Sequence, residues 1–381
     1  MTIAVEAPRT AEPAPRSPQS AHPPHQDAQE VTGVLDLTSG GHGFLRRSDL
    51  LPTPSDPRVP ADLIRRHRLR AGDRVTGVLG PRGKLHDLAE VPAKRAMFHE
   101  LTPLHPHRPL RLEHPGGGLA PRVIDLVAPI GKGQRGLIVA PPRAGKTVLL
   151  QQIAAAVTAN HPDCHLMTLL VDERPEEVTD MRRSVRGEVF ASTFDRPPKD
   201  HIALAELAVE RAKRLVEQGR DVVLLLDSLT RLCRAHNNAA GAGGRTLSGG
   251  VDARALHGPK RLFGAARQTE EGGSLTIIAT ALVETGSRAD DYFFEELKST
   301  GNMELRLDRT AAEARLHPAV AVTPSGTRRE ELLVSPADLG AVHTLRRALA
   351  RHDAPTALET LLHGLRRTPD NAAFLSAAAP R

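Results

Sequence analysis

The chain has 381 residues, 40% of them hydrophobic, which is enough for two or three domains and at least one sizeable core. Its formal net charge of +6 suits a polyanionic partner, and its two cysteines, Cys164 and Cys233, lie too far apart in sequence to form a metal-binding pattern. No apolar run reaches the length of a membrane span and no signal peptide is evident, so we expect a reduced, cytoplasmic protein with no membrane partner.

The residue composition of the N-terminal third changes along the chain. Residues 1–30 are rich in Pro, Ala and Ser, and this composition predicts a disordered tail. Residues 31–92 contain short alternating apolar segments ("VTGVLDL", "GHGFLRR", "DRVTGVLG") separated by turn residues, which predict a small β-barrel. Residues 31–94 hold eleven Lys/Arg against seven Asp/Glu, so most of the net charge lies here. Residues 93–125 are punctuated by Pro and Gly, and we interpret them as a linker.

From residue 126 to the C-terminus, apolar runs alternate with amphipathic stretches. The runs "GLIVA", "LMTLLV", "DVVLLLD" and "SLTIIAT" are nearly continuous, as in strands buried on both faces. Helical stretches such as "IALAELAVERAKRLVEQG" lie between them, and residues 340–368 are also helical in pattern. The pattern predicts an α/β domain over residues 126–381 with a parallel sheet covered on both faces.

A phosphate-binding loop is predicted by "GLIVAPPRAGKTVLL", residues 136–150, which reads as a strand, a tight loop and the start of a helix. Backbone N–H groups of such a loop can surround a phosphate, Lys146 can reach the outer phosphates, and the Thr147 hydroxyl can hold Mg²⁺. The usual first glycine is replaced by Ala140, and the following Pro141 and Pro142 can form a stiffer turn instead.

Carboxylates follow two of the predicted strands, at the edge where ligands bind in such sheets. Asp227 ends "DVVLLLD" and suits a Mg²⁺ contact, although a lone Asp at a strand end is usually a turn residue. Asp172 and Glu173 end "LMTLLVDE", and Glu173 is our candidate for activating water. The alternative is that Glu173 pairs with Arg174 or caps the next helix.

Several arginines lie in polar loops. Arg245 and Arg288 stand in the Gly-rich stretch 239–250 and in "ETGSRADD", loops that could line a nucleic-acid channel or could be flexible and solvated. Arg328 and Arg315 lie in "SGTRREELL" and "AEARLHPA". A phosphoryl-transfer site is often completed by a neighbouring subunit's Arg, but spacing alone favours a surface salt bridge for Arg328.

Five stretches together resemble one family, the bacterial transcription termination factors Rho: "GQRGLIVAPPRAGKT", "VDERPEEVTDMRRSVRGEV", "LLLDSLTRLCRAHN", "LSGGVDARALHGPKRLFGAARQTEEGGSLTIIATAL" and "TGNMEL". The likeness runs from about residue 99 to about residue 335, and it includes the Ala-Pro-Pro opening of the loop. It implies a homohexameric ring of RecA-like P-loop ATPase domains, each preceded by an OB-fold/cold-shock-like barrel. Such rings load onto single-stranded nascent RNA, pull it through the centre using ATP, and dissociate RNA polymerase.

Site residues follow from the resemblance by position. The catalytic residues it implies are Glu173, Lys146 and Arg328, the last reaching the next subunit's ATP. The implied ATP-binding residues are Arg143, Ala144, Gly145, Lys146, Thr147, Val148, Arg174, Arg231 and Arg315, and the Mg²⁺ ligands are Thr147 and Asp227. The implied RNA-binding residues are His42, Phe44, Arg46, Arg58, Arg245 and Arg288.

The chain departs from the family pattern at four places. His42 and Arg58 stand where aromatic residues are usual, Arg288 where Lys is usual, and His317 where a Phe is expected to pack on adenine. Two alternatives stay open, the first because of the altered barrel and the second because of the shared RecA-like core. One is a Rho-like RNA-binding paralogue with weak or regulatory termination activity. The other is a rotary or secretion-type RecA-like ATPase, which shares a "DSLTR" strand but lacks "DERPEEV".

Overall fold

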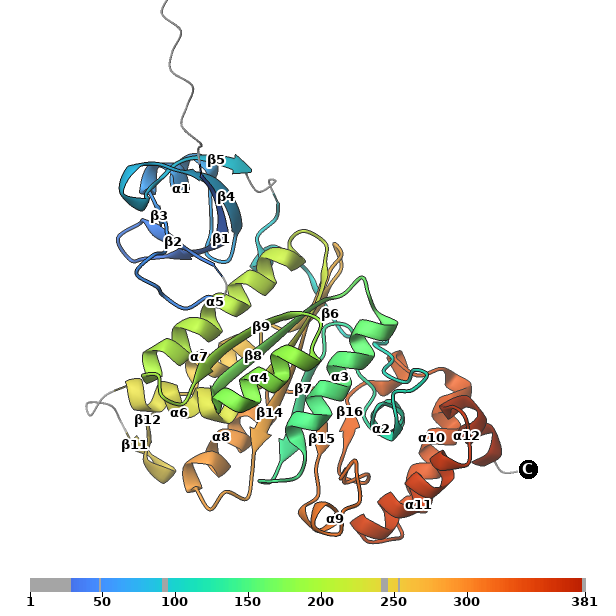
Figure 1. The fold of residues 1–381 in the computed structure, drawn as a ribbon. Helices are drawn as coiled ribbons and strands as arrows, with labels where there is room; N and C mark the ends of the chain where they lie inside the picture. The colour runs from blue at the N-terminus through green and yellow to red at the C-terminus, as the bar shows by residue number, and fades with distance from the viewer. Residues whose placement is uncertain (1–28, 48, 91–94, 241–245, 253, 379–381) are drawn as a thin grey trace, which may run out of the picture.

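The computed structural model describes residues 29–47, 49–90, 95–240, 246–252 and 254–378. Most of the predicted N-terminal tail and the candidate Arg245 lie outside these residues. Figure 1 shows a small barrel at the N-terminal end, a central sheet with helices on both faces, and a group of C-terminal helices at the far side. The architecture confirms the predicted fold class.

The barrel is a five-stranded antiparallel sheet of order β3-β2-β1-β4-β5. Alternating side chains form its separate core, in which Leu35, Leu45 and Val75 are buried. A bridge between Arg58 and Lys84 joins the two edges of the sheet. Its elements are β1 (Glu30–Leu37), β2 (Gly43–Arg46), β3 (Arg58–Val59), α1 (Ala61–His67), β4 (Arg74–Leu79), η1 (Pro81–Gly83) and β5 (Leu85–Glu90).

The central sheet has the order β16-β15-β7-β14-β10-β8-β9, and its six strands from β15 to β9 are parallel. Continuous aliphatic runs form these strands because helices cover both faces, with separate apolar cores on the two sides. The strands are β7 (Arg135–Ala140), β8 (His165–Glu173), β9 (Glu188–Thr193), β10 (Asp221–Asp227), β14 (Ser274–Leu282), β15 (Met303–Arg306) and β16 (Gly326–Thr327).

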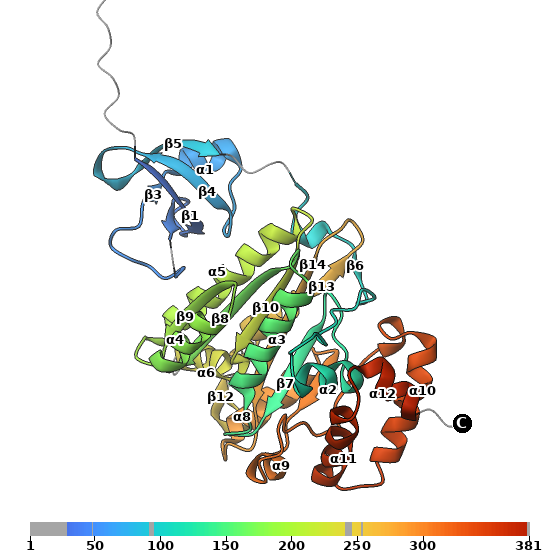
Figure 2. The same ribbon diagram turned by 45° about the vertical axis from the view of Figure 1, so that its right-hand side comes forward.

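The helices divide between the two faces of the sheet (Figure 2). On one side lie α2 (Leu119–Val127), α3 (Lys146–Asn160), α4 (Pro175–Ser184), α9 (Arg309–Glu313), α10 (Pro336–Leu349), α11 (Ala354–Arg366) and α12 (Asn371–Ala378). On the other lie α5 (Pro198–Val216), α6 (Leu229–Ala239), α7 (His257–Phe263) and α8 (Arg288–Lys298). The remaining short elements are η2 (Phe98–Glu100), β6 (Pro103–Leu104), β11 (Thr246–Leu247), η3 (Ser248–Gly250), β12 (Val251–Asp252), β13 (Arg267–Thr269) and η4 (Glu330–Leu332).

The segment that we interpreted as a linker takes part in the second domain. Its strand β6 pairs with β13, and most residues of α2 are buried. The Asp125 carboxylate accepts the backbone N–H groups of Leu112 and Glu113, and burial raises the pKa of this carboxyl to about 6. Pro and Gly therefore shape an irregular but packed connection here, since its buried polar groups find partners within the domain.

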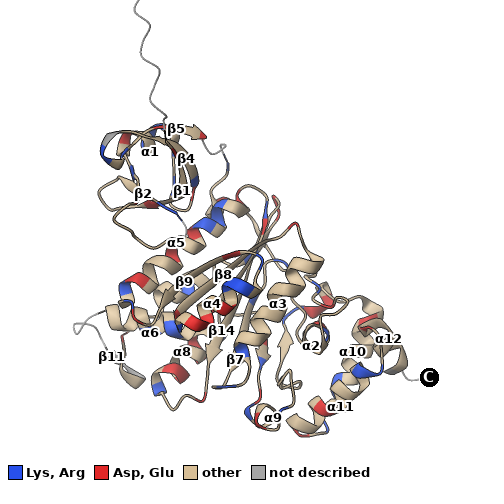
Figure 3. Ribbon diagram, viewed as in Figure 1, with Lys and Arg blue, Asp and Glu red and all other residues tan. Residues whose placement is uncertain are grey.

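A buried ionic cluster joins the barrel to α5. Glu217, whose side chain is fully buried, pairs with Arg70 at 2.6 Å, Arg95 at 2.9 Å and Arg214 at 3.1 Å, and Arg95 also pairs with Asp73 of the barrel. Figure 3 shows Lys/Arg and Asp/Glu positions interspersed along α5 beneath the barrel. Three guanidinium groups share one carboxylate, so Glu217 fixes the barrel's position on the ATPase domain.

Candidate functional site: a phosphate loop facing two buried carboxylates

The phosphate loop lies between β7 and α3, as the sequence predicts. Arg143 and Gly145 have positive φ angles of 65° and 91°, and these turn the backbone into the first residues of α3. Ala144 is buried, whereas Val148 is 56% exposed. The free N–H groups of a helix N-terminus favour phosphate at this position.

Lys146 contacts both predicted carboxylates. Its Nζ atom lies 2.6 Å from Asp227 Oδ2 and 2.9 Å from Glu173 Oε1, and each carboxylate residue is only 1% exposed. The Thr280 hydroxyl donates to the other Asp227 oxygen at 2.7 Å. Strand β14, which carries Thr280, lies between the strands of the loop and of Asp227, so the Lys146 side chain reaches across it.

The charges of these groups alter one another's protonation. Burial and then the negative charge of Asp227 raise the pKa of the Glu173 carboxyl, although Lys146 and Arg231 act in the opposite direction. Burial alone lowers the pKa of Lys146, but Asp227 and Glu173 outweigh it, and the pKa stands above its ordinary value. Lys146 therefore stays charged, as a phosphate ligand must.

The second oxygen of Glu173 has a different environment. Glu173 Oε2 is buried and has no hydrogen-bond partner among the described residues, whereas Oε1 is held by Lys146. A buried acceptor without a partner costs about 1–3 kcal/mol, so it favours binding a donor. The attacking water of a hydrolysis reaction is a donor of this kind. Glu173 does not cap α4 in the structure, because no side chain forms a cap hydrogen bond at the start of that helix.

Thr147 and its neighbours supply oxygen ligands of the kind that Mg²⁺ prefers. The Thr147 hydroxyl makes only a long contact, 3.5 Å, with Glu177 Oε2. Glu177 in turn lies 3.8 Å from exposed Arg174. A hydroxyl and the Asp227 carboxylate are a donor set that fits the ion.

A cavity of about 430 Å³ opens beside the loop. Sequence reasoning identified His317 as a packing surface for adenine, and the structure places it in this cavity with Val148. The phosphate loop contributes Ala144 and Gly145 to the same cavity, both of which the family resemblance implies. The remaining lining residues carry no motif, and most come from segments distant in the chain, so the sequence did not point to them. They are Leu119, Ala120, Leu149, Gln152, Leu307, Pro318 and Ala319.

The other predicted ATP-binding arginines differ in their surroundings. Arg231 is half-buried, donates to the Asp172 backbone oxygen, and lies 3.6 Å from Glu173 Oε1. Arg143 and Arg315 are exposed, and Arg315 follows α9 with a positive φ of 61°. Arg231 therefore contacts the candidate base of its own chain, while Arg315 is exposed at the surface.

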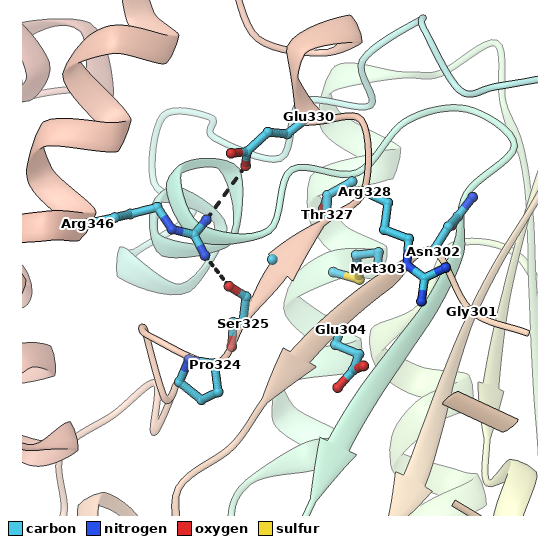
Figure 4. A pocket seen from close by; sticks show the side chains of 11 residues that line it. Gly301, Asn302, Met303, Glu304, Pro324, Ser325, Thr327, Arg328, Glu330 and Arg346 are labelled. Carbon is cyan, nitrogen blue, oxygen red and sulfur yellow. Dashed lines mark hydrogen bonds and ion pairs between the residues drawn. The ribbon is translucent and has the colours of Figure 1, made fainter. Parts of the chain in front are cut away.

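Arg328 follows β16, whose Thr327 lies level with the start of β7, whereas the phosphate loop follows the end of β7. It lines a cavity of about 250 Å³ next to β15 and β16 (Figure 4). Figure 4 shows Arg346 bonded to Ser325 and close to Glu330, whereas the Arg328 guanidinium lies beside Asn302 without such a partner. Its backbone N–H donates to Asn302 O at 2.9 Å. In the described part of the chain, exposed Arg328 forms no ion pair, contrary to what its spacing favours.

Three of the predicted RNA-binding residues share one face of the barrel. His42 packs edge-on against Phe44 with a centroid distance of 5.7 Å, and Arg58 is the cross-strand partner of Phe44. Arg46 is only 7% exposed and pairs with Asp36 at 2.5 Å and Asp56 at 2.6 Å. It lies 5.3 Å from the Phe44 ring centroid and supports that ring instead of presenting a free charge.

The two predicted central loops meet in space. Gly249 approaches the backbone of Arg288 so closely that an added Cβ atom would lie 3.0 Å from the Arg288 carbonyl carbon. Arg288 begins α8 and is exposed. The juxtaposition agrees with both loops facing the same ligand.

Comparison with known proteins agrees with this geometry. Residues 120–327 match the nucleotide-binding domain of the ATP synthase alpha/beta family, and residues 31–93 match the RNA-binding domain of the Rho termination factor. The fold and site thus define a P-loop ATPase that carries an RNA-binding barrel. The chain belongs to the family of the transcription termination factor Rho.

The relatives that share this name cover nearly the whole chain. The Rho of Streptomyces coelicolor is 67% identical over 94% of this chain and 88% of that protein. The Rho of Streptosporangium roseum is 58% identical over 95% of this chain and 96% of that protein. The Rho of Mycobacterium tuberculosis is 56% identical over 91% of this chain, which spans 61% of that longer protein.

Among solved structures, an ATPase from the type III secretion system of pathogenic bacteria superposes with a TM-score of 0.61 at 22% identity, over 76% of this chain and 90% of that one. The ATPase EscN of the enteropathogenic E. coli type III secretion system superposes with a TM-score of 0.57 at 20% identity, over 84% of this chain and 86% of that one. These likenesses show a shared fold. Within the described residues, no helix has the length and apolar character needed to cross a bilayer.

Proposed function

We propose that the protein is an ATP-dependent RNA translocase and helicase that terminates transcription by releasing nascent RNA from RNA polymerase. The observation that carries the proposal is the contact of Lys146 with two buried carboxylates in a chain whose barrel matches the Rho RNA-binding domain. The Rho name of its relatives supports the same activity.

The proposed hydrolysis depends on four side chains. Lys146 exchanges its carboxylate partners for the outer phosphates when ATP binds, because a phosphate competes well for a buried ammonium. Glu173 is then freed to hold the attacking water and accept its proton. Thr147 and Asp227 would hold Mg²⁺, which neutralises phosphate charge when it is bound.

We further propose a homohexameric ring in which Arg328 completes a neighbouring subunit's site. The Arg328 side chain is exposed and forms no ion pair in the described chain, and it follows Thr327, which lies level with the start of β7, whereas the loop follows the end of that strand. An Arg supplied by a neighbour stabilises the charge of the transferred phosphoryl group and contributes about 10³–10⁵ in rate where it has been measured.

Helix α6 offers a physical link between RNA and hydrolysis. Its Arg231 contacts Asp172 and Glu173, and its Arg234 pairs with Asp290 of α8 at 2.5 Å. The Asp290 side chain is fully buried and also accepts from Thr285, which places it behind the loop that carries Arg288. If RNA binding moves that loop, helix α6 would therefore transmit the movement to Glu173.

The experiment that tests the proposal has two readouts. Purified protein should hydrolyse ATP faster with single-stranded RNA than without it, and it should release transcripts from stalled elongation complexes only with ATP. RNA-stimulated hydrolysis without transcript release would favour an RNA-binding paralogue with weak termination activity. Hydrolysis that is independent of RNA would contradict the proposal.

A further inference from the structure

A β-bulge lies immediately before Glu173. Val171 pairs with Ser192 of β9 and Glu173 pairs with Thr193, so Asp172 is an additional residue in β8 without a partner on β9. Its φ angle of 59° is left-handed, a conformation that Asp tolerates better than most residues. One extra residue shifts the alternation of side chains along a strand. The bulge therefore decides that Glu173 points toward Lys146.

Arg231 holds the bulge from one side. Its Nη1 atom donates to the backbone oxygen of Asp172 and lies 3.4 Å from the Asp172 carboxylate, and its Nη2 atom lies 3.6 Å from Glu173 Oε1. One planar guanidinium thus contacts both the bulged residue and the candidate base. Because a guanidinium is rigid, moving Asp172 also changes the position of Arg231 against Glu173.

A buried histidine lies close to the side chain of the bulged residue. His201 of α5 is buried, its Nδ1 atom lies 2.7 Å from the Ser192 hydroxyl, and its Nε2 atom lies 4.0 Å from the Asp172 carboxylate. When the Ser192 hydroxyl donates to Nδ1, the proton of the neutral ring lies on Nε2, the nitrogen nearer to Asp172. Ser192 is itself fully buried and is the β9 partner of the residue before the bulge.

We propose that His201, oriented by Ser192, is a positioning residue that fixes the Asp172 bulge and so aims Glu173 at the attacking water. The proposal rests on the role of Glu173 in the proposed function. Burying a polar pair inside an apolar layer is costly unless its partners are satisfied. Here the pair joins α5 and β9 to the residue of β8 that bulges out between Val171 and Glu173.

Two substitutions of His201 separate positioning from packing. The amide of Asn replaces the Nδ1 position and can keep the Ser192 contact, whereas the longer Gln places its amide at the Nε2 position, facing Asp172. If the contact with Asp172 matters, His201→Gln should keep RNA-stimulated kcat within about fivefold of the parent. His201→Asn should lose about 10- to 100-fold, since a displacement of about 1 Å in a site costs about 10² in rate. The Kd for ATP should change less than about twofold in both. If His201 acts only through its contact with Ser192, the order is reversed: His201→Asn should keep the higher kcat and His201→Gln the lower.

The control variant Glu173→Gln separates the two proposals. If it turns over at the parent rate, the role of Glu173 fails, and hydrogen exchange of residues 170–176 then decides on the bulge. We expect faster exchange there in His201→Asn than in His201→Gln at equal melting temperature. If Glu173→Gln is inactive while His201→Asn keeps the parent's kcat, or if exchange is the same in both His201 variants, the positioning role is wrong.

Discussion

Restoring aromatic residues to the barrel should change how the protein binds RNA. The face around Phe44 carries one aromatic ring with His42 against its edge, and Arg58 lies opposite on β3. We predict that His42→Phe with Arg58→Tyr strengthens binding to oligo-C and weakens the salt dependence. The double substitution replaces one smaller ring and one cation with two larger stacking surfaces.

The magnitude follows from the contacts of this face. Stacking contributes about 1–3 kcal/mol per base, and His and Arg keep part of that value because both are planar. We therefore expect a net gain of about 1–3 kcal/mol, which is about 5- to 150-fold in Kd. The double substitution removes one cation from this face, Arg58. Arg46 contributes little free charge there, because its guanidinium is paired with Asp36 and Asp56. The log–log salt slope should then become shallower by about 0.7.

The assay is binding of full-length protein to oligo-C, oligo-U and oligo-A across a salt series, in an Arg288→Ala background that removes a cation predicted to bind RNA outside the barrel. Arg66→Tyr on α1 is a matched control that makes the same change of Arg to Tyr outside the strands that carry Phe44 and Arg58. The parent should show weaker cytosine preference than the double variant. The reasoning is refuted if the parent already binds oligo-C tightly and selectively, with a slope no steeper than the double variant's.

Four further outcomes are expected. Glu173→Gln should bind ATP but lose most turnover, whereas Lys146→Ala should weaken nucleotide binding itself; the reverse pattern in equilibrium binding and steady-state rates would contradict the assignment. Parent turnover should fall as pH drops through the raised pKa of Glu173, since the protonated acid accepts no proton, and a pH–rate profile with no such acid limb would contradict this. Arg328→Ala should bind ATP and assemble without hydrolysing it, and mixing it with Glu173→Gln protein should restore some activity; mixed rings without any rescue would exclude action between subunits. Glu217→Ala leaves three guanidinium groups without their shared carboxylate and should cost about 3–5 kcal/mol of stability, so an unchanged denaturation midpoint would show that the cluster does not hold the barrel.

Local sequence patterns predicted the parts of the site that depend on neighbouring residues. A strand, a Gly-Lys-Thr loop and a helix specify the phosphate loop, and acidic residues at strand ends point to the same edge of a parallel sheet. These rules located Lys146, Glu173 and Asp227, and the structure places them in contact. The five resembling stretches added the family, which the comparisons confirm.

Contacts between distant segments were beyond prediction from the sequence. Nothing in "RLRAGD" or "VEQG" shows that Arg70 and Glu217 meet, and Arg46 resembles any exposed RNA-binding cation until Asp36 and Asp56 are placed around it. The bulge at Asp172 is also invisible in the residue pattern, because its register depends on how β8 pairs with β9.

The most direct test of the account is ATP hydrolysis by the purified protein, measured with and without single-stranded RNA for the parent and for Glu173→Gln side by side. Hydrolysis by the parent should rise at least several-fold with RNA, and Glu173→Gln should stay near background in both conditions while still binding ATP. A parent rate that RNA does not change, or a Glu173→Gln rate equal to the parent's, would contradict the claim that this site is an RNA-coupled ATPase centre with Glu173 as its base.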